Sequence, residues 1–269
     1  MMNSFFSTGR ARRAACVTVA ALAAWASQSA FADASPHALS FDYDHQDAWH
    51  IESGTSQSPI DIRSAEAVSA VHWKDESGRI VVHVTQTDAA VIDNGHTIEV
   101  LPQQASATIR GRRFTMLQAH FHAPAEHTID GARYPVEGHF VFRAQDGRLA
   151  VVAVVYRQGD ANSQFGQIVS AARRGVQTPL LGLDLTKLLP ADTDSYYHYL
   201  GSLTTPPLSE NVEWYVLTEP MTLSAADIAA FTQRYASNAR RTQPLNGRPV
   251  IRHSGESAER AAPLDPAAD

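Results

Sequence analysis

Two short segments within residues 118–141 constrain the fold of this chain more than any other stretch. The first contains His120 and His122, and the second, after a turn, contains His139. In an extended strand, side chains two residues apart point to the same face, so His120 and His122 share a face. If the two segments pair as neighbouring strands, all three imidazoles converge on one face of a sheet.

Each histidine row has a polar residue two positions before its first member: Gln118 before His120, and Glu137 before His139. Such a residue can hold the ring N–H that points away from the cluster. Three neutral imidazole nitrogens with an open fourth position are the donor set of a catalytic zinc site. The pattern therefore predicts bound Zn²⁺, while the spacing alone leaves other histidine-rich metal sites open.

The N-terminus has the three parts of a secretory signal peptide. Arginines precede the apolar run 14–26, and small residues follow it up to Ala32. We therefore predict a signal peptide over residues 1–32, cleaved near Ala32/Asp33, and a periplasmic or secreted protein. The apolar run is too short to cross a bilayer comfortably, so we expect no membrane span in the mature chain. The single cysteine, Cys16, lies in the removed segment, which predicts a mature chain without disulfides.

Length and charge limit the remaining possibilities. Residues 33–269 suit one domain, with a tail after about residue 254 that we expect to be disordered. Loss of the three arginines of the signal peptide changes the formal charge from −6 to −9. An acidic surface of this kind argues against a nucleic-acid partner and leaves a small-molecule substrate as the expectation. The oligomeric state is not predicted.

Short runs rich in Val, Ile, Phe and Thr, separated by Gly, Asn or Asp turns, predict β-strands along the chain. These runs are 80–85, 90–93, 97–101, 107–109, 114–121, 136–143, 149–156 and 211–217. The run 149–155 is almost wholly apolar, which predicts a strand buried on both faces.

Two segments, 163–173 and 225–235, are predicted to be helical, the second with Ser224 as its N-cap. The fold class is therefore mainly β with peripheral helices: a single domain on a large, mostly antiparallel, twisted central sheet.

Together the motifs resemble those of α-class carbonic anhydrases of the bacterial, exported kind. They cover most of the mature chain and are Gln57-Ser-Pro-Ile-Asp-Ile62, Asn94-Gly-His96, His120-Phe-His122 with His139, Gly201-Ser-Leu-Thr-Thr-Pro-Pro207, Trp214 and Asn246-Gly-Arg-Pro249. The resemblance implies reversible hydration of carbon dioxide to bicarbonate and a proton, by attack of zinc-bound hydroxide. Weak ester hydrolysis is an implied side activity.

The resemblance also implies a role for each matching residue. The zinc ligands would be His120, His122 and His139, supported by Gln118, Glu137 and the backbone carbonyl of Asn246. Thr204 would accept a hydrogen bond from the hydroxide, Glu126 would accept one from Thr204, and His96 would be the proton shuttle. The substrate pocket would be formed by Val141, Val151, Leu203, Thr204, Thr205, Val212 and Trp214.

The chain departs from the family pattern at three places. Ala119 stands where a phenylalanine normally precedes the first ligand, and Leu208 stands where bacterial relatives carry a disulfide cysteine. Tyr43 resembles the active-site tyrosine of the family but lacks its glycine neighbours. None of these changes removes a catalytic group.

Two other interpretations remain open at this point. The first is a cupin-type metalloprotein, in which Glu126 would be a metal ligand and the metal often iron or manganese. Pro124, between His122 and Glu126, counts against that strand. The second is a secreted, non-catalytic zinc-binding protein on the same scaffold. Without the resemblance, Thr204 and His96 could equally be ordinary turn residues.

Overall fold

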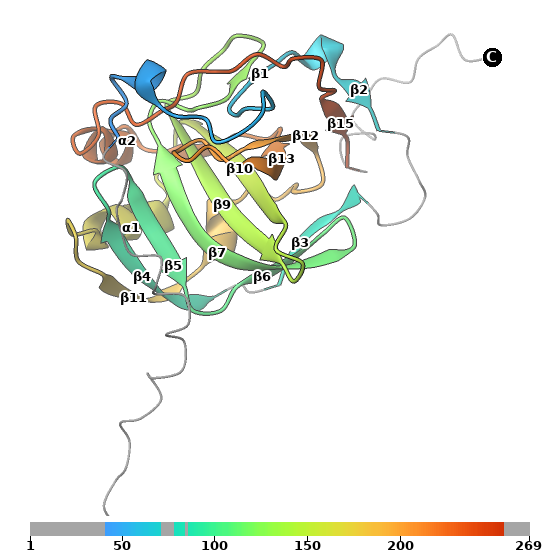
Figure 1. Cartoon of the computed structure of the whole chain (residues 1–269). Coiled ribbons are helices and arrows are strands. Elements are labelled where there is room, and N and C mark those ends of the chain that lie inside the picture. Colours follow the sequence, from blue (N-terminus) through green and yellow to red (C-terminus); the bar gives the residue numbers. More distant parts are fainter. Residues whose placement is uncertain (1–40, 71–77, 84–85, 256–269) are drawn as a thin grey trace, which may run out of the picture. The chain divides into compact units, whose positions relative to one another are not determined.

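The computed structural model describes residues 41–70, 78–83 and 86–255 of the 269-residue chain. The predicted signal peptide with Cys16 and the predicted tail from residue 256 onward lie outside the described residues. Within them, one large, mixed and twisted β-sheet dominates, accompanied by few helices (Figure 1). The fold class predicted from the sequence is confirmed.

The described strands are, in chain order, β1 (Asp61–Ile62), β2 (Val68–Ser69), β3 (Ile80–Val82), β4 (Thr87–Asp93), β5 (Ile98–Pro102), β6 (Ser106–Ile109), β7 (Arg112–His122), β8 (Thr128–Ile129), β9 (Val136–Ala144), β10 (Leu149–Gln158), β11 (Thr178–Leu183), β12 (Tyr196–Ser202), β13 (Glu210–Leu217), β14 (Met221–Leu223) and β15 (Ile251–His253). In this part of the chain, 13 strands form the main sheet, with the spatial order β11-β4-β5-β7-β9-β10-β13-β12-β15-β2 and with β3, β6 and β14 off this path. The pair β1–β8 is separate.

Most neighbouring strands are antiparallel, including the long central series β7–β9–β10. The parallel pair β10–β13 makes the sheet mixed. Each of the eight runs predicted as strands overlaps a described strand, with ends shifted by a few residues, although positions 84–85 of the first run lie outside the described residues. The short strands β1, β2, β8, β14 and β15, and the longer strands β11 and β12, lack the runs rich in Val, Ile, Phe and Thr that the sequence argument relied on. They were missed for that reason.

A β-bulge in β7 decides which face its side chains occupy. Met116 lies opposite Phe142 and Gln118 lies opposite Val141, so Leu117 is an extra residue in the ladder. Met116 packs in the larger apolar core, whereas Leu117 packs against the smaller one on the other face. The extra residue reverses the alternation, so residues of the same parity lie on opposite faces before and after it.

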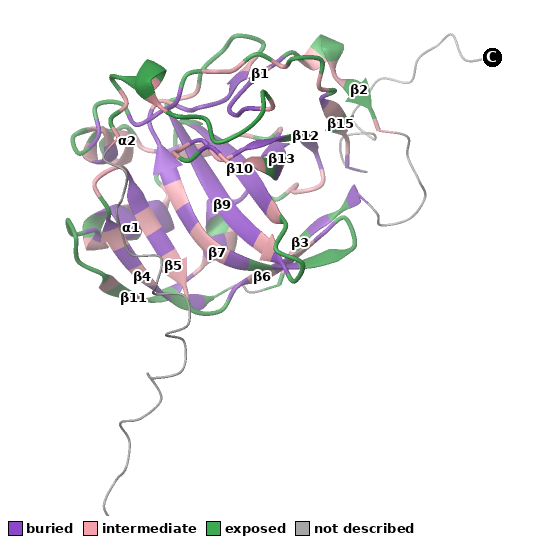
Figure 2. Cartoon of the chain, in the orientation of Figure 1, coloured by how far each residue is buried: buried purple, intermediate pink, exposed green. Residues whose placement is uncertain are grey.

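The larger apolar core lies on the face of the sheet that the helices cover. Residues of α1 (Ser163–Ala171) and α2 (Ala225–Thr232), including Phe165, Ile168 and Phe231, are fully buried in it. The smaller core contains Val141, Val151 and Trp214 and lies on the other face. Both faces of β9 and most of β10 are therefore buried, as predicted for 149–155 (Figure 2).

Both helices begin at side-chain caps and end earlier than predicted. The Asn162 side chain accepts hydrogen bonds from the amides of Gln164 and Phe165. Ser224 and Asp227 form a reciprocal capping box, which confirms the predicted N-cap. The remaining described helical turns are 3₁₀, at Gln46–Ala48, Ser64–Glu66 and Leu185–Leu188. Of the helices that the structure describes, none combines the length and apolar character needed to span a bilayer.

Candidate metal centre

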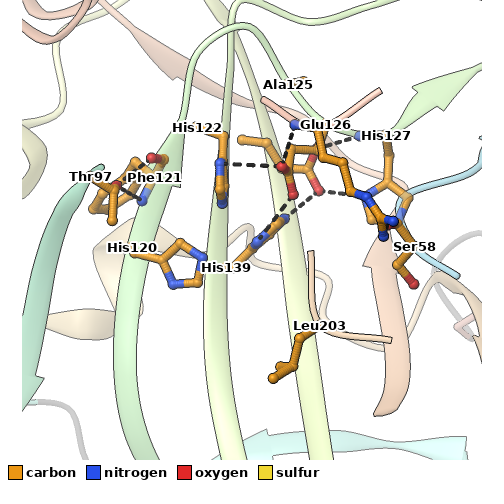
Figure 3. Close-up of polar contacts among 12 residues, drawn as sticks. Ser58, Thr97, His120, Phe121, His122, Ala125, Glu126, His127, His139 and Leu203 are labelled. Atoms are coloured by element: carbon orange, nitrogen blue, oxygen red, sulfur yellow. Dashed lines mark hydrogen bonds and ion pairs between the residues drawn. The ribbon is translucent and has the colours of Figure 1, made fainter. Parts of the chain in front are cut away.

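Three histidines from β7 and β9 lie side by side on the face of the smaller core. His120 is directly opposite His139 in the antiparallel register. The ring centroids are 4.9 Å apart for His120 and His122, 5.1 Å for His120 and His139, and 4.6 Å for His122 and His139. One nitrogen of each ring lies within 4.8 Å of the others (Figure 3). The convergence predicted from strand alternation is present, because the bulge at Leu117 precedes both histidines of β7.

The other nitrogen of each ring is committed to a hydrogen bond, and this fixes the tautomers. His120 donates from Nδ1 to Gln118 Oε1 at 2.8 Å, and His139 donates from Nε2 to Glu137 Oε1 at 2.8 Å. His122 donates from Nδ1 to a backbone carbonyl. The nitrogens left to face one another are therefore Nε2 of His120, Nε2 of His122 and Nδ1 of His139.

The predicted partner of His122 is wrong. Its Nδ1 donates to the carbonyl of Asn238 at 2.6 Å, and not to that of Asn246. The backbone of Asn246 is left-handed, with φ of 51°, and its side-chain amide donates to Thr55 O at 2.8 Å. Asn246 therefore belongs to a tight turn, and the resemblance placed the role eight positions too late in the chain.

The donor set fits a zinc ion. His122 Nε2 is buried and has no hydrogen-bond partner. Buried polar atoms in native proteins have partners, so this nitrogen is available to bind a metal ion. Burial lowers the pKa of all three histidines, most strongly for His120, where the neighbouring rings of His122 and His139 add to the effect. Three neutral nitrogens held by outer hydrogen bonds match the ligand set of a catalytic zinc site.

His127 shares in the site, and sequence reasoning missed it. Its Nδ1 donates to Glu137 Oε1 at 2.6 Å, and its Nε2 shares a hydrogen bond of 2.7 Å with the Tyr199 hydroxyl. His127, Glu137 and His139 are close enough to suggest a second metal group. Both nitrogens of His127 are already hydrogen bonded, however, so this group is a buried network behind His139. The Glu137 pKa is well below its usual range: burial raises it, but His127 and His139 outweigh burial.

Glu126 and Thr204 lie together beside the histidines, both buried. Glu126 Oε1 accepts from the Arg240 amide at 2.7 Å, and Oε2 lies 4.0 Å from His139 Nδ1. Burial raises the pKa of Glu126 to about 7, against the lowering effects of His139, the Arg240 amide and, more weakly, the Thr204 hydroxyl. Oε2 makes no hydrogen bond of normal geometry. Thr204 is therefore a close neighbour of the carboxylate, and the contact is not a fully formed hydrogen bond.

Tyr43 lies near the same carboxylate. Burial raises the pKa of the Tyr43 hydroxyl, and the charge of Glu126 raises it further. The irregular arm that carries Tyr43 is tied to the body by Gln46, whose side-chain amide donates to Ala239 O at 3.1 Å. The arm thus holds Tyr43 within electrostatic range of Glu126.

The five predicted apolar pocket residues occupy one side of the site. Val141, Val151, Val212 and Trp214 belong to the smaller core, and Leu203 packs against it. Val141 lies opposite Val151, and Val151 lies opposite Trp214, on adjacent strands. Figure 3 shows Leu203 on the same side of the strands as the histidine rings. Thr205, the other predicted pocket residue, is half-buried next to Thr204.

His96 lies in a turn between β4 and β5, as predicted, and is half-buried. Its ring stacks on Phe41, with centroids 4.1 Å apart and planes 14° from parallel. The side chain of Asn238 donates to His96 O at 2.9 Å. Asn238 therefore contacts both the turn of His96 and the ring of His122, and no spacing in the sequence indicated either contact.

Residues 44–254 match the family model described as eukaryotic-type carbonic anhydrase. A carbonic anhydrase of Pectobacterium carotovorum is 41% identical over 208 residues, which cover 74% of this chain and 81% of that protein. The solved α-carbonic anhydrase of Thermovibrio ammonificans, in complex with the inhibitor sulfanilamide, is 39% identical with a TM-score of 0.68, over 74% of this chain and 87% of that one. The solved carbonic anhydrase Cah3 of Chlamydomonas reinhardtii, in complex with acetazolamide, is 31% identical with a TM-score of 0.71. The match covers 79% of this chain and 99% of that one.

Proposed function

Because this chain belongs to the eukaryotic-type carbonic anhydrase family and is an enzyme of that kind, we propose that it hydrates carbon dioxide through a zinc ion held by His120, His122 and His139. One observation carries the proposal: one nitrogen of each ring donates a hydrogen bond away from the cluster, and the three remaining nitrogens face one another. When bound, zinc lowers the pKa of a coordinated water to about 7, a value for which carbonic anhydrase is itself the standard example.

Gln118, Glu137 and the Asn238 carbonyl orient the ligands in this scheme. Each accepts a hydrogen bond from a ring N–H, so each histidine presents its other nitrogen as a neutral electron-pair donor to the metal. Glu137 is in turn held by the His127 ring and the His127 amide, at 2.6 and 2.8 Å. The network therefore fixes the orientation of the His139 ring.

Thr204 and Glu126 orient the nucleophile. The Thr204 hydroxyl is held as an acceptor of a hydrogen bond from the attacking oxygen when its own proton is donated elsewhere, and an ionised Glu126 is an obligate acceptor for that proton's hydrogen bond. Glu126 is itself fixed by the Arg240 amide. The pair thereby aims a lone pair at the substrate, which contributes to rate through positioning.

The apolar residues beside the histidines form the carbon dioxide site. Carbon dioxide is uncharged and a poor hydrogen-bonding partner, so an apolar surface is the suitable one. Val141, Val151 and Trp214 provide that surface within the smaller core. Thr205 lies at the edge of the site, where the polar product leaves.

His96 relays the proton that each cycle releases. For a group of pKa about 7, the rate of proton loss directly to water is limited to roughly 10³ s⁻¹. This follows because the rate constant for recombination with the proton cannot exceed about 10¹⁰ M⁻¹s⁻¹. Faster turnover needs a relay of similar pKa, and a histidine in a turn close to solvent provides one. Weak ester hydrolysis at the same zinc is part of the proposal.

The signal-like N-terminus leads us to propose export, with cleavage near Ala32/Asp33. N-terminal sequencing of the secreted or periplasmic protein tests this directly. A retained Met1 would contradict it.

Metal analysis combined with stopped-flow carbon dioxide hydration tests the function. We expect one zinc per chain, and loss of zinc and of hydration in His120→Ala, His122→Ala and His139→Ala. His83→Ala is the matched control, because His83 is exposed and its ring is hydrogen bonded to Thr108, away from the histidine cluster. An active, zinc-free wild type would overturn the proposal, as would full zinc occupancy after loss of a ligand.

A further inference from the structure

The loop between β12 and β13 carries Thr204 and folds back on itself. The Leu203 amide donates to Ser209 O at 2.9 Å, and the Leu208 amide donates to Thr205 O at 3.0 Å. The backbone of Leu208 is left-handed, with φ of 64°, which is an unfavourable conformation for a residue with a side chain. A loop that contains such a residue keeps its shape through contacts with the structure around it.

The segment 52–58 supplies such contacts from the N-terminal part of the described chain. The Glu52 amide donates to Pro207 O at 3.3 Å, and Gln57 Nε2 donates to Leu208 O at 3.2 Å. Two backbone carbonyls of the loop are therefore held by groups that lie far away in the sequence.

Glu210, the first residue of β13, ties the same segment to the C-terminal end of the loop. Its Oε1 accepts a hydrogen bond from the Ser56 amide at 2.5 Å and lies 3.4 Å from Gln57 Nε2. The carboxylate packs against Gly54, where a Cβ would overlap it and where φ is +77°, so glycine is required at this position. Glu210 is half-buried. A charge-assisted hydrogen bond in such a place is stronger than a neutral one, so Glu210 is a firm link between segment and loop.

The segment that Glu210 binds also holds Glu126, the partner of Thr204. Arg240 Nη1 donates to Gln57 Oε1 at 2.9 Å, and the Arg240 amide donates to Glu126 Oε1 at 2.7 Å. Gln57 therefore bonds the Thr204 loop through its Nε2 and the anchor of Glu126 through its Oε1. Contacts with this one segment set Thr204 and Glu126 relative to each other.

We propose that Glu210 is a positioning residue of Thr204: by binding the Ser56 amide, it fixes the loop so that the Thr204 hydroxyl stays within reach of Glu126. The contact between Thr204 and Glu126 is not a fully formed hydrogen bond, so a small shift of the loop is enough to make or break it. The inference rests on the proposed function, in which these two residues orient the nucleophile. It extends that function by naming a carboxylate that acts through Thr204 and has no need to touch substrate or metal.

Glu210→Leu removes the acceptor and should loosen the loop. We expect kcat/KM for carbon dioxide to fall by about tenfold, because the Thr204 hydroxyl is displaced, while metal analysis shows unchanged zinc content. Glu210→Gln keeps a carbonyl oxygen for the Ser56 amide, so its kcat/KM should stay within about twofold of the wild-type value. Glu66→Leu is the matched control, since the Glu66 carboxylate is exposed and lies 3.2 Å from Arg63 Nη1. Glu210→Ala replaces Glu210→Leu in every measurement if the leucine variant does not fold.

A double-mutant cycle separates the positioning of Thr204 from a general loss of structure. If Glu210 acts through Thr204, Glu210→Leu should cause no further loss of kcat/KM in a Thr204→Val background. A protein weakened throughout would instead show the product of the two losses. Hydrogen exchange of the metal-free and the zinc-loaded protein gives a second readout. In Glu210→Leu the amides of residues 203–209 should exchange faster, while those of β9 should exchange as in the wild type.

The positioning proposal is overturned if Glu210→Leu keeps the wild-type kcat/KM, or if hydrogen exchange of the loop is unchanged. It is equally overturned if Glu210→Gln or Glu66→Leu loses as much activity as Glu210→Leu, or if the losses multiply in the double variant. Failure of the proposed function looks different: Thr204→Val itself would then keep the wild-type kcat/KM.

Discussion

The backbone carbonyl of Asn238 accepts the Nδ1 proton of His122 at 2.6 Å, across a separation of 116 residues in the chain. The side chain of the same asparagine accepts from the Ala123 amide and donates to the carbonyls of His96 and Phe121. One residue thus orients a predicted metal ligand and ties the end of β7 to the turn of His96.

Asn238→Ala should weaken both stability and zinc binding. The carbonyl remains, but three hydrogen bonds of a buried side chain are lost, each costing about 1–3 kcal/mol when a partner is left unsatisfied. We expect zinc affinity, measured by competition with a chelator, to fall by about 10- to 100-fold. Asn246→Ala is the control and should keep wild-type zinc affinity. The reverse ranking of the two variants would restore the role first predicted for Asn246.

Glu126→Gln should retain zinc and lose rate. The amide can donate a hydrogen bond to Thr204, so the Thr204 proton is no longer fixed toward position 126. We expect full zinc occupancy by metal analysis and a decrease in kcat/KM of about 100-fold. Thr204→Val should have a similar effect. Loss of metal from Glu126→Gln would instead indicate a carboxylate ligand, as in a cupin.

Val141 should act through its size. Val141→Ala keeps the pocket apolar and should change kcat/KM only slightly. Val141→Tyr should lower kcat/KM for carbon dioxide by about two orders of magnitude, because the larger ring fills the space beside the histidines, while the zinc content stays unchanged. A tyrosine variant as active as the wild type would remove Val141 from the substrate site.

His96→Ala should separate proton transfer from chemistry. In dilute buffer we expect kcat to fall toward about 10³ s⁻¹, the limit set by direct proton loss to water, while kcat/KM stays nearly constant. Added imidazole should restore much of kcat. An unchanged kcat in dilute buffer would mean that another group carries the proton.

The free energy of unfolding should vary with pH in the acid range because of Glu213. His198, whose Nε2 lies 3.6 Å from Oε2, has the largest effect, and together with Tyr215 and Arg148 it lowers the pKa of Glu213 to about 2 against the opposing effect of burial. Because the pKa of Glu213 is lower in the folded state, the ionised carboxylate stabilises the fold at pH values above the unfolded pKa of about 4.5. This contribution to the free energy of unfolding is lost as the pH falls through the pKa of the folded state. Urea unfolding between pH 5 and about 2 should therefore be less pH-dependent in Glu213→Gln.

The parts of the site that could be predicted from the sequence are those that depend on short spacings. Gln118 and His120, like Glu137 and His139, are two residues apart, and strand alternation alone places each pair on one face. The resemblance added Glu126, Thr204 and the apolar pocket, which the structure gathers around the histidines.

The parts that could not be predicted depend on contacts between distant segments. The contact between the Asn238 carbonyl and His122 depends on the path that the chain takes after α2. Any residue type can supply a backbone carbonyl, so the sequence does not mark this acceptor. His127 had no distinguishing neighbour in the sequence, and its importance comes from the buried Tyr199 and Glu137 that it joins. Strands such as β11 and β12 are stabilised by their place in the sheet and not by apolar runs of their own.

The bulge at Leu117 is one residue more than the ladder between β7 and β9 needs. Phe114, Met116, Gln118 and His120 are all even-numbered, yet the first two face the larger core and the last two face the metal site. Because Leu117 is the extra residue, deleting its codon would leave a regular strand in which both pairs keep their faces. Such a deletion would remove the contact of Leu117 with the smaller core but would not move an imidazole to the other face of the sheet.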